Sequence, residues 1–189
     1  MENTSTKTRC AWAGNDPIYQ HYHDVEWGKP KHNDDELFEL LILEGFQAGL
    51  SWITILKKRE NFREAFHQFD YQVIAKYNDD DFSRLLQNAG IVRNKLKIRA
   101  AKQNALAFID IQKAFGSFSD YFWAFSQHQI IRNNFEDLKE VPASTLLSER
   151  ISKDLKKRGF KFVGPTIVYA FMQSMGMVND HVCSCDFRD

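Results

Sequence analysis

Apolar residues recur along most of the chain at spacings of three and four residues, the period that places side chains on one face of an α-helix. The strict alternation of apolar and polar residues that is typical of strands is nearly absent. With Asn, Asp or Ser before many apolar runs and Gly after several, this pattern predicts helices at about 16–27, 35–48, 51–66, 79–90, 94–115, 118–125, 142–159 and 165–176. The stretch 126–141 is the least regular and is predicted to be the longest loop. The predicted fold class is all-α.

Length and composition narrow the class of protein. With 189 residues and 43% hydrophobic content, the chain can bury one sizeable core, so we predict a disordered tail at 1–9 and a single domain at 10–189. No apolar run reaches the length of a membrane span, and three cysteines suit a reducing compartment, so a soluble cytoplasmic protein is expected. Since 25 basic residues balance 25 acidic ones, any DNA-binding surface must come from local clustering of charge.

Potential metal ligands stand at both ends of the chain. Cys10 and His23 lie near its start; near its end, His181 and Cys185 are four residues apart, a spacing that can place both on one helical face. Two Cys and two His form a closed tetrahedral zinc shell, which is structural because no position remains for a catalytic water. From spacing alone, unrelated surface histidines and buried thiols explain these residues equally well.

One glutamate occupies the apolar stripe of the helix predicted at 35–48. That stripe consists of Leu37, Leu40, Leu41, Glu44 and Ala48. A carboxylate there is costly unless something pairs with it, and the pattern alone favours a structural ion pair or an exposed helix end. However, Tyr22, Trp27 and Trp52 are close in sequence to this helix. An acid among aromatic rings is a pocket for a flat cation.

Two glycines bracket a short segment between the last two predicted helices. A basic helix ends at Gly159, and Gly164 with Pro165 begins the next helix. Such a start leaves backbone N–H groups free to bind a phosphate, and the neighbouring Lys157 and Lys161 add positive charge. The pattern predicts a helix-hairpin-helix motif at about 152–176, although a basic helix end that only complements the helix dipole explains it equally well.

Longer stretches resemble one known family. They include Tyr22-His23-Asp24-x-Glu26-Trp27-Gly28, Leu43-Glu44-Gly45-x-Gln47-Ala48-Gly49-Leu50-Ser51-Trp52, the hairpin segment 155–164 and Gly176-x-Val178-Asn179-Asp180-His181. Over about residues 10–185 the chain resembles the 3-methyladenine DNA glycosylase I family of the helix-hairpin-helix superfamily. The resemblance implies a two-lobed helical fold and a bacterial enzyme of base-excision repair, which hydrolyses the N-glycosidic bond of 3-methyladenine in alkylated double-stranded DNA. It also implies a monomer and free 3-methyladenine as the product ligand.

The resemblance also assigns site residues. It implies one structural zinc on Cys10, His23, His181 and Cys185, which would join the N- and C-terminal segments. The base, flipped out of the duplex, would bind Tyr22, Trp27, Glu44 and Trp52, with Glu44 as the catalytic group. The predicted DNA contacts are Leu50, as a wedge, and Lys157, Gly159, Lys161, Gly164 and Thr166.

Two positions bear on the chemistry. Superfamily enzymes that also nick the strand resemble one another in a Lys where this chain has Thr166, so we expect no lyase activity. Most members have a catalytic Asp where this chain has Asn179, with Asp180 beside it. That departure suits a base that already carries positive charge and leaves easily.

Three alternatives remain at this stage. His21 or Cys183 could replace one of the expected zinc ligands. His23-Asp24 and Asp180-His181 could instead form the oxygen-rich metal site of a phosphohydrolase, although thiolates favour closed zinc sites. A DNA-lesion binder or zinc scaffold without catalysis is the third alternative.

Overall fold

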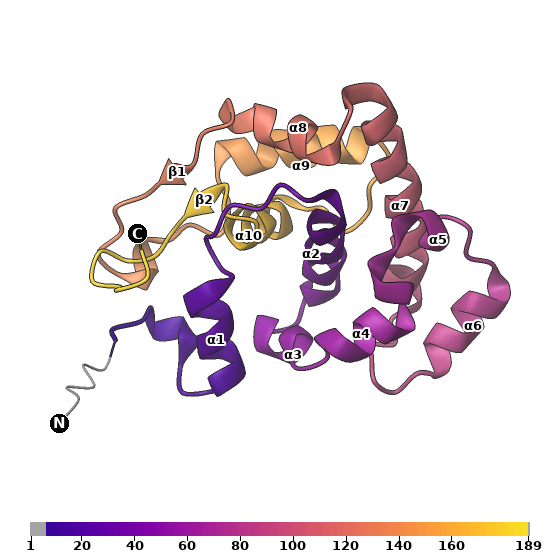
Figure 1. Ribbon diagram of the computed structural model, residues 1–189, viewed down its shortest axis with the longest axis horizontal. Coiled ribbons are helices and arrows are strands. Elements are labelled where there is room, and N and C mark those ends of the chain that lie inside the picture. Colours follow the sequence, from indigo (N-terminus) through magenta and orange to yellow (C-terminus); the bar gives the residue numbers. More distant parts are fainter. Residues whose placement is uncertain (1–6, 189) are drawn as a thin grey trace.

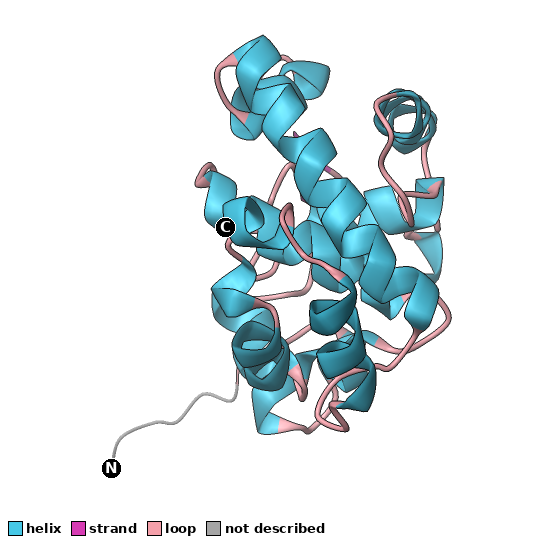
Figure 2. Ribbon diagram, turned by 90° about the vertical axis from the view of Figure 1, so that its right-hand side faces the viewer, coloured by secondary structure: helices cyan, strands magenta, loops and turns pink. Residues whose placement is uncertain are grey.

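The computed structural model describes residues 7–188, and helices make up most of them (Figure 2). The α-helices are α1 (Pro17–Val25), α2 (Asp34–Gln47), α3 (Trp52–Leu56), α4 (Arg59–Ala65), α5 (Tyr71–Ile74), α6 (Asp79–Gln87), α7 (Lys95–Phe115), α8 (Phe118–Trp123), α9 (Leu146–Lys157) and α10 (Pro165–Ser174). Short 3-10 turns lie at η1 (Ala11–Ala13), η2 (His67–Phe69), η3 (Ala124–Ser126) and η4 (Leu138–Glu140). Within residues 7–188 the strands are β1 (Ile131–Arg132) and β2 (Val178–Asn179), which pair in parallel. The prediction of an all-α fold is confirmed.

Side-chain caps explain why several helices begin where the sequence predicted. Asn33, Asn78 and Asn94 each accept hydrogen bonds from backbone N–H groups in the first turn of α2, α6 and α7. Ser117 does the same for α8. These groups would otherwise lack partners, so a short polar side chain at that position defines the helix start.

Three predicted elements differ from the structure. The helix expected at 51–66 is two helices, α3 and α4, with a turn at Lys57 and Lys58, where Lys57 pairs with Asp16 and Arg59 pairs with Glu26. The helix expected from 142 begins at Leu146, because the Thr145 side chain caps it. The pattern also missed α5, a single turn of four residues. In each case tertiary contacts or a cap overrode a local preference that is weak over so few residues.

Helix α2 lies at the centre of the molecule, with α10 on one side and α7 on another (Figure 1). Of the ten α2 positions from 37 to 46, all except Glu39 are buried. The predicted apolar stripe is therefore only part of a helix that is enclosed on most sides. Buried apolar side chains of the described residues join one continuous cluster, which includes α2, α7 and α10.

The two ends of the described chain meet beside α1 (Figure 1). Thr8 and Asp186 exchange two hydrogen bonds, and Arg9 forms a bidentate ion pair with Asp24. Thr8 and Arg9 thus contact partners distant in sequence, whereas positions 1–6 of the expected tail lie outside the described residues. The tail at 1–9 stays a prediction. No helix in the described part of the chain is long and apolar enough to cross a membrane.

Candidate functional site

A cavity of about 310 Å³ opens between α1, α2, α3, α10 and the loop that contains η4. Its aromatic lining consists of Trp12, Tyr19, Tyr22, Trp27 and Trp52, and its polar lining includes Glu44, Gln47 and Gln173. All four residues expected to bind a base therefore lie in one cavity. A largely apolar hollow with few polar groups is the usual form of a small-molecule site.

The local helical geometry positions the aromatic rings. Asp16 caps α1, Pro17 occupies its first turn, and Tyr19 and Tyr22 follow three residues apart on one face. The Tyr22 ring centroid lies 5.4 Å from that of Trp52, and the Trp12 centroid lies 4.9 Å from that of Tyr19. The cavity therefore offers several ring faces to a flat ligand.

Glu44 is buried in this cavity with an incomplete set of partners. Its side chain is on the enclosed helix α2, and the residue is 2% exposed. Its Oε2 has no hydrogen-bond partner among the described residues. Burial raises the pKa of Glu44 to about 8, and a hydrogen bond with Ser174 offsets only part of that rise. Burial therefore favours the protonated form of the Glu44 side chain at neutral pH, and a cationic ligand beside it would favour the ionised form.

Two further cavity groups also lack partners. Gln47 Oε1 and Trp52 Nε1 are buried and form no hydrogen bond with any described residue. With Glu44 Oε2, they give the cavity two free acceptors and one free donor. Most buried polar atoms in proteins are satisfied, so three exceptions in one cavity indicate the place of a polar ligand.

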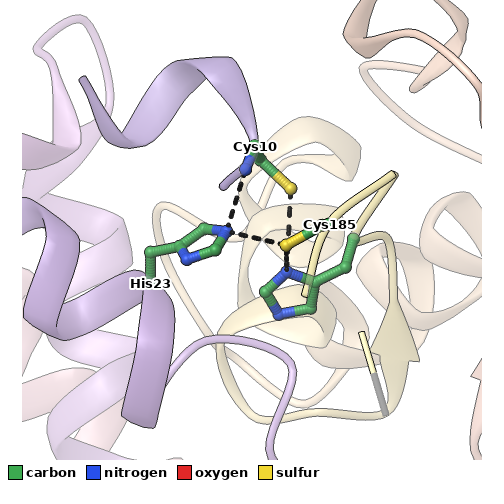
Figure 3. Close-up of side chains that lie close together, drawn as sticks. Cys10, His23 and Cys185 are labelled. Carbon is green, nitrogen blue, oxygen red and sulfur yellow. Dashed lines mark hydrogen bonds between the residues drawn. The ribbon is translucent and has the colours of Figure 1, made fainter. Parts of the chain in front are cut away.

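Next to this cavity the structure gathers Cys10, His23, His181 and Cys185, all buried, with their ligand atoms within 4.8 Å of one another. Figure 3 shows Cys10, His23 and Cys185 pointing toward one another. Cys185 Sγ lies 3.5 Å from His23 Nε2 and 3.3 Å from His181 Nδ1. A tetrahedral zinc with its usual bond lengths holds sulfur and nitrogen about 3.5 Å apart, so the four residues fit a metal ion of this kind.

The remaining ring nitrogens of the cluster have partners of their own. His23 Nδ1 lies 2.8 Å from Asp24 Oδ1, and His181 Nε2 lies 3.3 Å from the Trp27 carbonyl oxygen. Burial lowers the pKa of both histidines, that of His181 to about 4, so both rings stay neutral and present an acceptor nitrogen. Such outer contacts orient metal-binding histidines. The Trp27 contact also joins the cluster to the wall of the cavity.

The alternative ligands lie outside this cluster. Neither His21 nor Cys183 belongs to the group of four among the described residues. Asp24 and Asp180 are also outside the cluster. A site without carboxylate ligands is unlike the oxygen-rich centre of a phosphohydrolase.

The hairpin between α9 and α10 has the expected backbone. Gly159 adopts a φ of +97°, and Gly164 with Pro165 begins α10 without a side-chain cap. Lys157 and Lys161 are exposed there. Thr166 is exposed and lines the cavity. Within the described residues no lysine lines the cavity.

Leu50 and Asn179 also have defined places. Leu50 is 44% exposed in the turn between α2 and α3, next to the cavity but outside its lining. Asn179 is buried, and its side-chain amide donates to Arg188 O and accepts from His181 N. Asn179 therefore does not face the cavity.

Sequence reasoning missed several residues of this region. Gln47 and Tyr19 could have been found, because they lie three residues from Glu44 and Tyr22 on the same helix faces. Lys97 and Asn104 of α7 gave no signal: Lys97 Nζ donates to Phe46 O at the end of α2, and Asn104 exchanges two hydrogen bonds with the backbone of Lys161. Both buried side chains therefore fix the backbone of segments that the sequence analysis predicted to contact DNA.

The fold and the cavity define a helical protein with an aromatic ligand-sized cavity beside a Cys/His cluster. A family model described as methyladenine glycosylase matches residues 12–189, and the chain belongs to this family. It is 52% identical over 178 residues to a DNA-3-methyladenine glycosylase of Haemophilus influenzae, covering 94% of this chain and 96% of that protein. It is 51% identical over 177 residues to DNA-3-methyladenine glycosylase 1 of Escherichia coli K12, covering 94% and 95%.

Solved structures of the same family have the same fold as this chain. A crystal structure of 3-methyladenine DNA glycosylase I superposes with a TM-score of 0.93 at 50% identity, covering 95% of this chain and 98% of that one. The 3-methyladenine DNA glycosylase I of Staphylococcus aureus, from a study of 3-methyladenine recognition, has a TM-score of 0.93 at 36% identity and covers 96% of both chains. The predicted family is confirmed.

Proposed function

We propose that this protein is a monofunctional DNA glycosylase of base-excision repair that hydrolyses the N-glycosidic bond of 3-methyladenine in alkylated double-stranded DNA. The observation that carries the proposal is the aromatic cavity in which Glu44, Gln47 and Trp52 each keep one buried atom without a partner. Relatives that are half identical over almost the whole chain have the name of this activity. The enzyme would act in the cytoplasm as a monomer.

The proposed chemistry is selection followed by hydrolysis. The damaged nucleotide is flipped out of the duplex, and its base stacks against the rings of Tyr22, Trp27 and Trp52. Glu44 accepts a hydrogen bond from the base edge and complements its positive charge. Because 3-methyladenine is cationic in DNA and leaves as a neutral base, positioning and charge selection supply most of what the reaction needs.

DNA binding in this proposal uses the hairpin. Backbone N–H groups near Gly159, Gly164 and Thr166 approach the phosphates, and Lys157 and Lys161 add positive charge. Leu50 fills the gap left by the flipped nucleotide. The expected absence of lyase activity rests on Thr166, since a hydroxyl cannot form the Schiff base that strand nicking requires.

Cys10, His23, His181 and Cys185 would hold one zinc ion in this proposal. The metal would supply a link between the ends of the chain, because four protein ligands leave no position for a reacting water. Trp27, whose carbonyl contacts His181, would gain a fixed place in the cavity wall.

One assay tests the proposed function. Duplex DNA treated with a methylating agent is incubated with the protein, and free base and strand breaks are measured with and without a strong chelator. We expect release of 3-methyladenine without strand breaks, with the chelator acting only as far as it unfolds the protein. Binding to methylated DNA without release of base would instead indicate a lesion-binding protein.

A further inference from the structure

A second buried carboxylate lies behind the cavity, and three donors converge on it. Asp180 is 1% exposed and is absent from the cavity lining. Its Oδ2 accepts from the Tyr169 hydroxyl at 2.6 Å and from Gln173 Nε2 at 2.8 Å, and its Oδ1 accepts from Asn133 Nδ2 at 2.7 Å. Burial and the neighbouring Asp180 raise the pKa of Tyr169 well above that of a free tyrosine, so its hydroxyl keeps its proton. Tyr169 and Gln173 line the cavity, four residues apart on one face of α10.

The bond to Asp180 determines which atom Gln173 offers to the cavity. An amide has one donor end and one acceptor end, and a carboxylate can bind only the donor end. Gln173 Nε2 is therefore held by Asp180, and Gln173 Oε1 is directed elsewhere. Gln173 is only half-buried, and within the described residues Oε1 accepts no hydrogen bond. Because Gln173 lines the cavity and its donor end is held by Asp180, its remaining polar atom is an acceptor oxygen.

We propose that Gln173 Oε1 binds the water that attacks the deoxyribose carbon, and that Asp180 is the positioning residue that orients the Gln173 amide for this task. This inference rests on the proposed function. It supplies a water-binding group in a chain where Asn179, at the place of the usual catalytic acid, faces away from the cavity.

Gln173 lies on a different wall of the cavity from the groups that suit the edge of a base. The buried atoms of Glu44 and Gln47 without partners among the described residues belong to α2. Gln173 belongs to the last turn of α10, so its side chain is available to another part of a bound nucleotide.

The step balances without a strong base. The bond between the sugar carbon and the base nitrogen breaks, and its electron pair neutralises the departing base. The water oxygen bonds to the sugar carbon, and the proton that it then loses passes to solvent. Gln173 accepts a hydrogen bond and takes no proton, which is sufficient because the leaving base is already activated by its own charge.

The test compares four variants with wild type in single-turnover excision of 3-methyladenine from saturating methylated duplex. Gln173→Met keeps the length of the side chain but removes the acceptor. Asp180→Ala frees the amide, whereas Asp180→Asn keeps an acceptor for it. Asn133→Ala is the matched control, because it removes one bond to Asp180 from outside the cavity. Free 3-methyladenine binding, metal content and thermal unfolding are measured for each.

We expect Gln173→Met and Asp180→Ala to slow excision on the order of 10- to 100-fold, the cost of a poorly positioned reactant, with free-base affinity within about twofold of wild type. Asp180→Asn should recover most of the rate, and Asn133→Ala should stay within about threefold of wild type. If Asp180→Ala fails to fold, Gln173→Met and Asn133→Ala decide the matter.

Three results would overturn the inference while wild type still releases the base. The first is a Gln173→Met excision rate equal to that of wild type. The second is a loss of free-base affinity in Gln173→Met as large as its loss of excision rate, which would place Gln173 on the base. The third is a loss of excision rate in Asn133→Ala as large as that in Asp180→Ala, which would make the network only structural. A wild-type protein that releases no 3-methyladenine would instead refute the proposed function.

Discussion

Glu44 and Asp180 are both carboxylic acids that are almost fully buried, at 2% and 1% exposure, yet their surroundings differ completely. Asp180 accepts hydrogen bonds from three side chains. Glu44 has an oxygen without a hydrogen-bond partner in the part of the chain that the structure describes, and burial raises its pKa to about 8. A satisfied buried acid stabilises and orients its neighbours, whereas an unsatisfied one weakens the fold and is retained for a ligand.

The C-terminal segment and the cavity differ in the same way, by whether their buried polar groups have hydrogen-bond partners. In the C-terminal segment around Asp180 and the Cys/His cluster, buried polar groups are partnered, so substitutions there should reduce stability. In the cavity, Glu44, Gln47 and Trp52 keep unpartnered atoms, so conservative substitutions there should reduce function at little cost in stability.

The largest expected effect is loss of the proposed zinc site. Cys10→Ala or His181→Ala should lower the free energy of unfolding by about 3–5 kcal/mol, a fraction of what structural zinc contributes in small zinc-dependent domains. Turnover by the protein that stays folded should fall much less. Denaturant unfolding and metal analysis measure this, with Cys183→Ala as the control outside the cluster. A variant without metal that retains full stability would contradict the structural assignment.

Glu44 should also give the protein an unusual dependence on pH. Its pKa rises from 4.5 to about 8 on folding, so the folded state binds more protons than the unfolded state between these values, and stability falls as pH rises. Relative to Glu44→Gln, wild type should lose about 3–4 kcal/mol of unfolding free energy between pH 5 and pH 8. Denaturant unfolding at several pH values tests this, with exposed Glu60→Gln as control. Parallel pH profiles for wild type and Glu44→Gln would mean that Glu44 is not held in a raised-pKa state.

Two tryptophans allow a direct comparison of partnered and unpartnered groups. Trp52 Nε1 has no partner among residues 7–188, whereas Trp123 Nε1 donates to Lys31 O at 2.9 Å. Trp52→Phe should therefore leave stability almost unchanged but reduce the rate of excision. Trp52→Ala should slow excision by a further factor of about 5 to 150, equivalent to about 1–3 kcal/mol, because the stacking face is lost. Trp123→Phe should cost about 1–3 kcal/mol of stability and leave excision by the folded protein intact. A loss of stability in Trp52→Phe together with a loss of excision in folded Trp123→Phe would contradict this prediction.

The smallest effect is expected at the hairpin. Replacing Lys157 and Lys161 with Gln should weaken binding to damaged and undamaged duplexes alike and reduce the slope of log affinity against log salt by about 2. Lys113→Gln, an exposed change paired with Asp110 on α7, serves as the control. An unchanged salt slope would mean that DNA approaches another surface, such as the one around Lys57 and Lys58.

Residue type and local period marked the unusual residues, but they did not assign their roles. Spacing left the four Cys and His residues without a decision, and Glu44 stood out only because a carboxylate on an apolar helix stripe is unusual. The resemblance to a known family supplied the roles, and the structure brings the four Cys and His side chains together. The helix starts were predictable where an Asn or Ser cap defines them locally.

The remaining features depend on contacts between distant segments. Gln173 acquires its orientation from Asp180, whose position depends on the pairing of Arg132 with Asn179 and on Asn133. The loop at 126–141 was expected to be irregular, but nothing in its sequence indicated that Leu138 and Val141 line the cavity. Such arrangements have no local period, so a single sequence does not reveal them.

The most direct test of the central claim is excision by Glu44→Gln beside wild type, with titration of free 3-methyladenine into both proteins. The variant keeps the size and one acceptor of Glu44 but removes its charge. We predict a fall in excision of roughly 100-fold or more, since charge complementarity is strong in a buried cavity. The loss in free-base binding should be smaller, because the released base is largely neutral, and stability should be equal or higher. A Glu44→Gln protein that binds and excises 3-methyladenine like wild type would show that Glu44 is only a structural acid and that the base binds elsewhere.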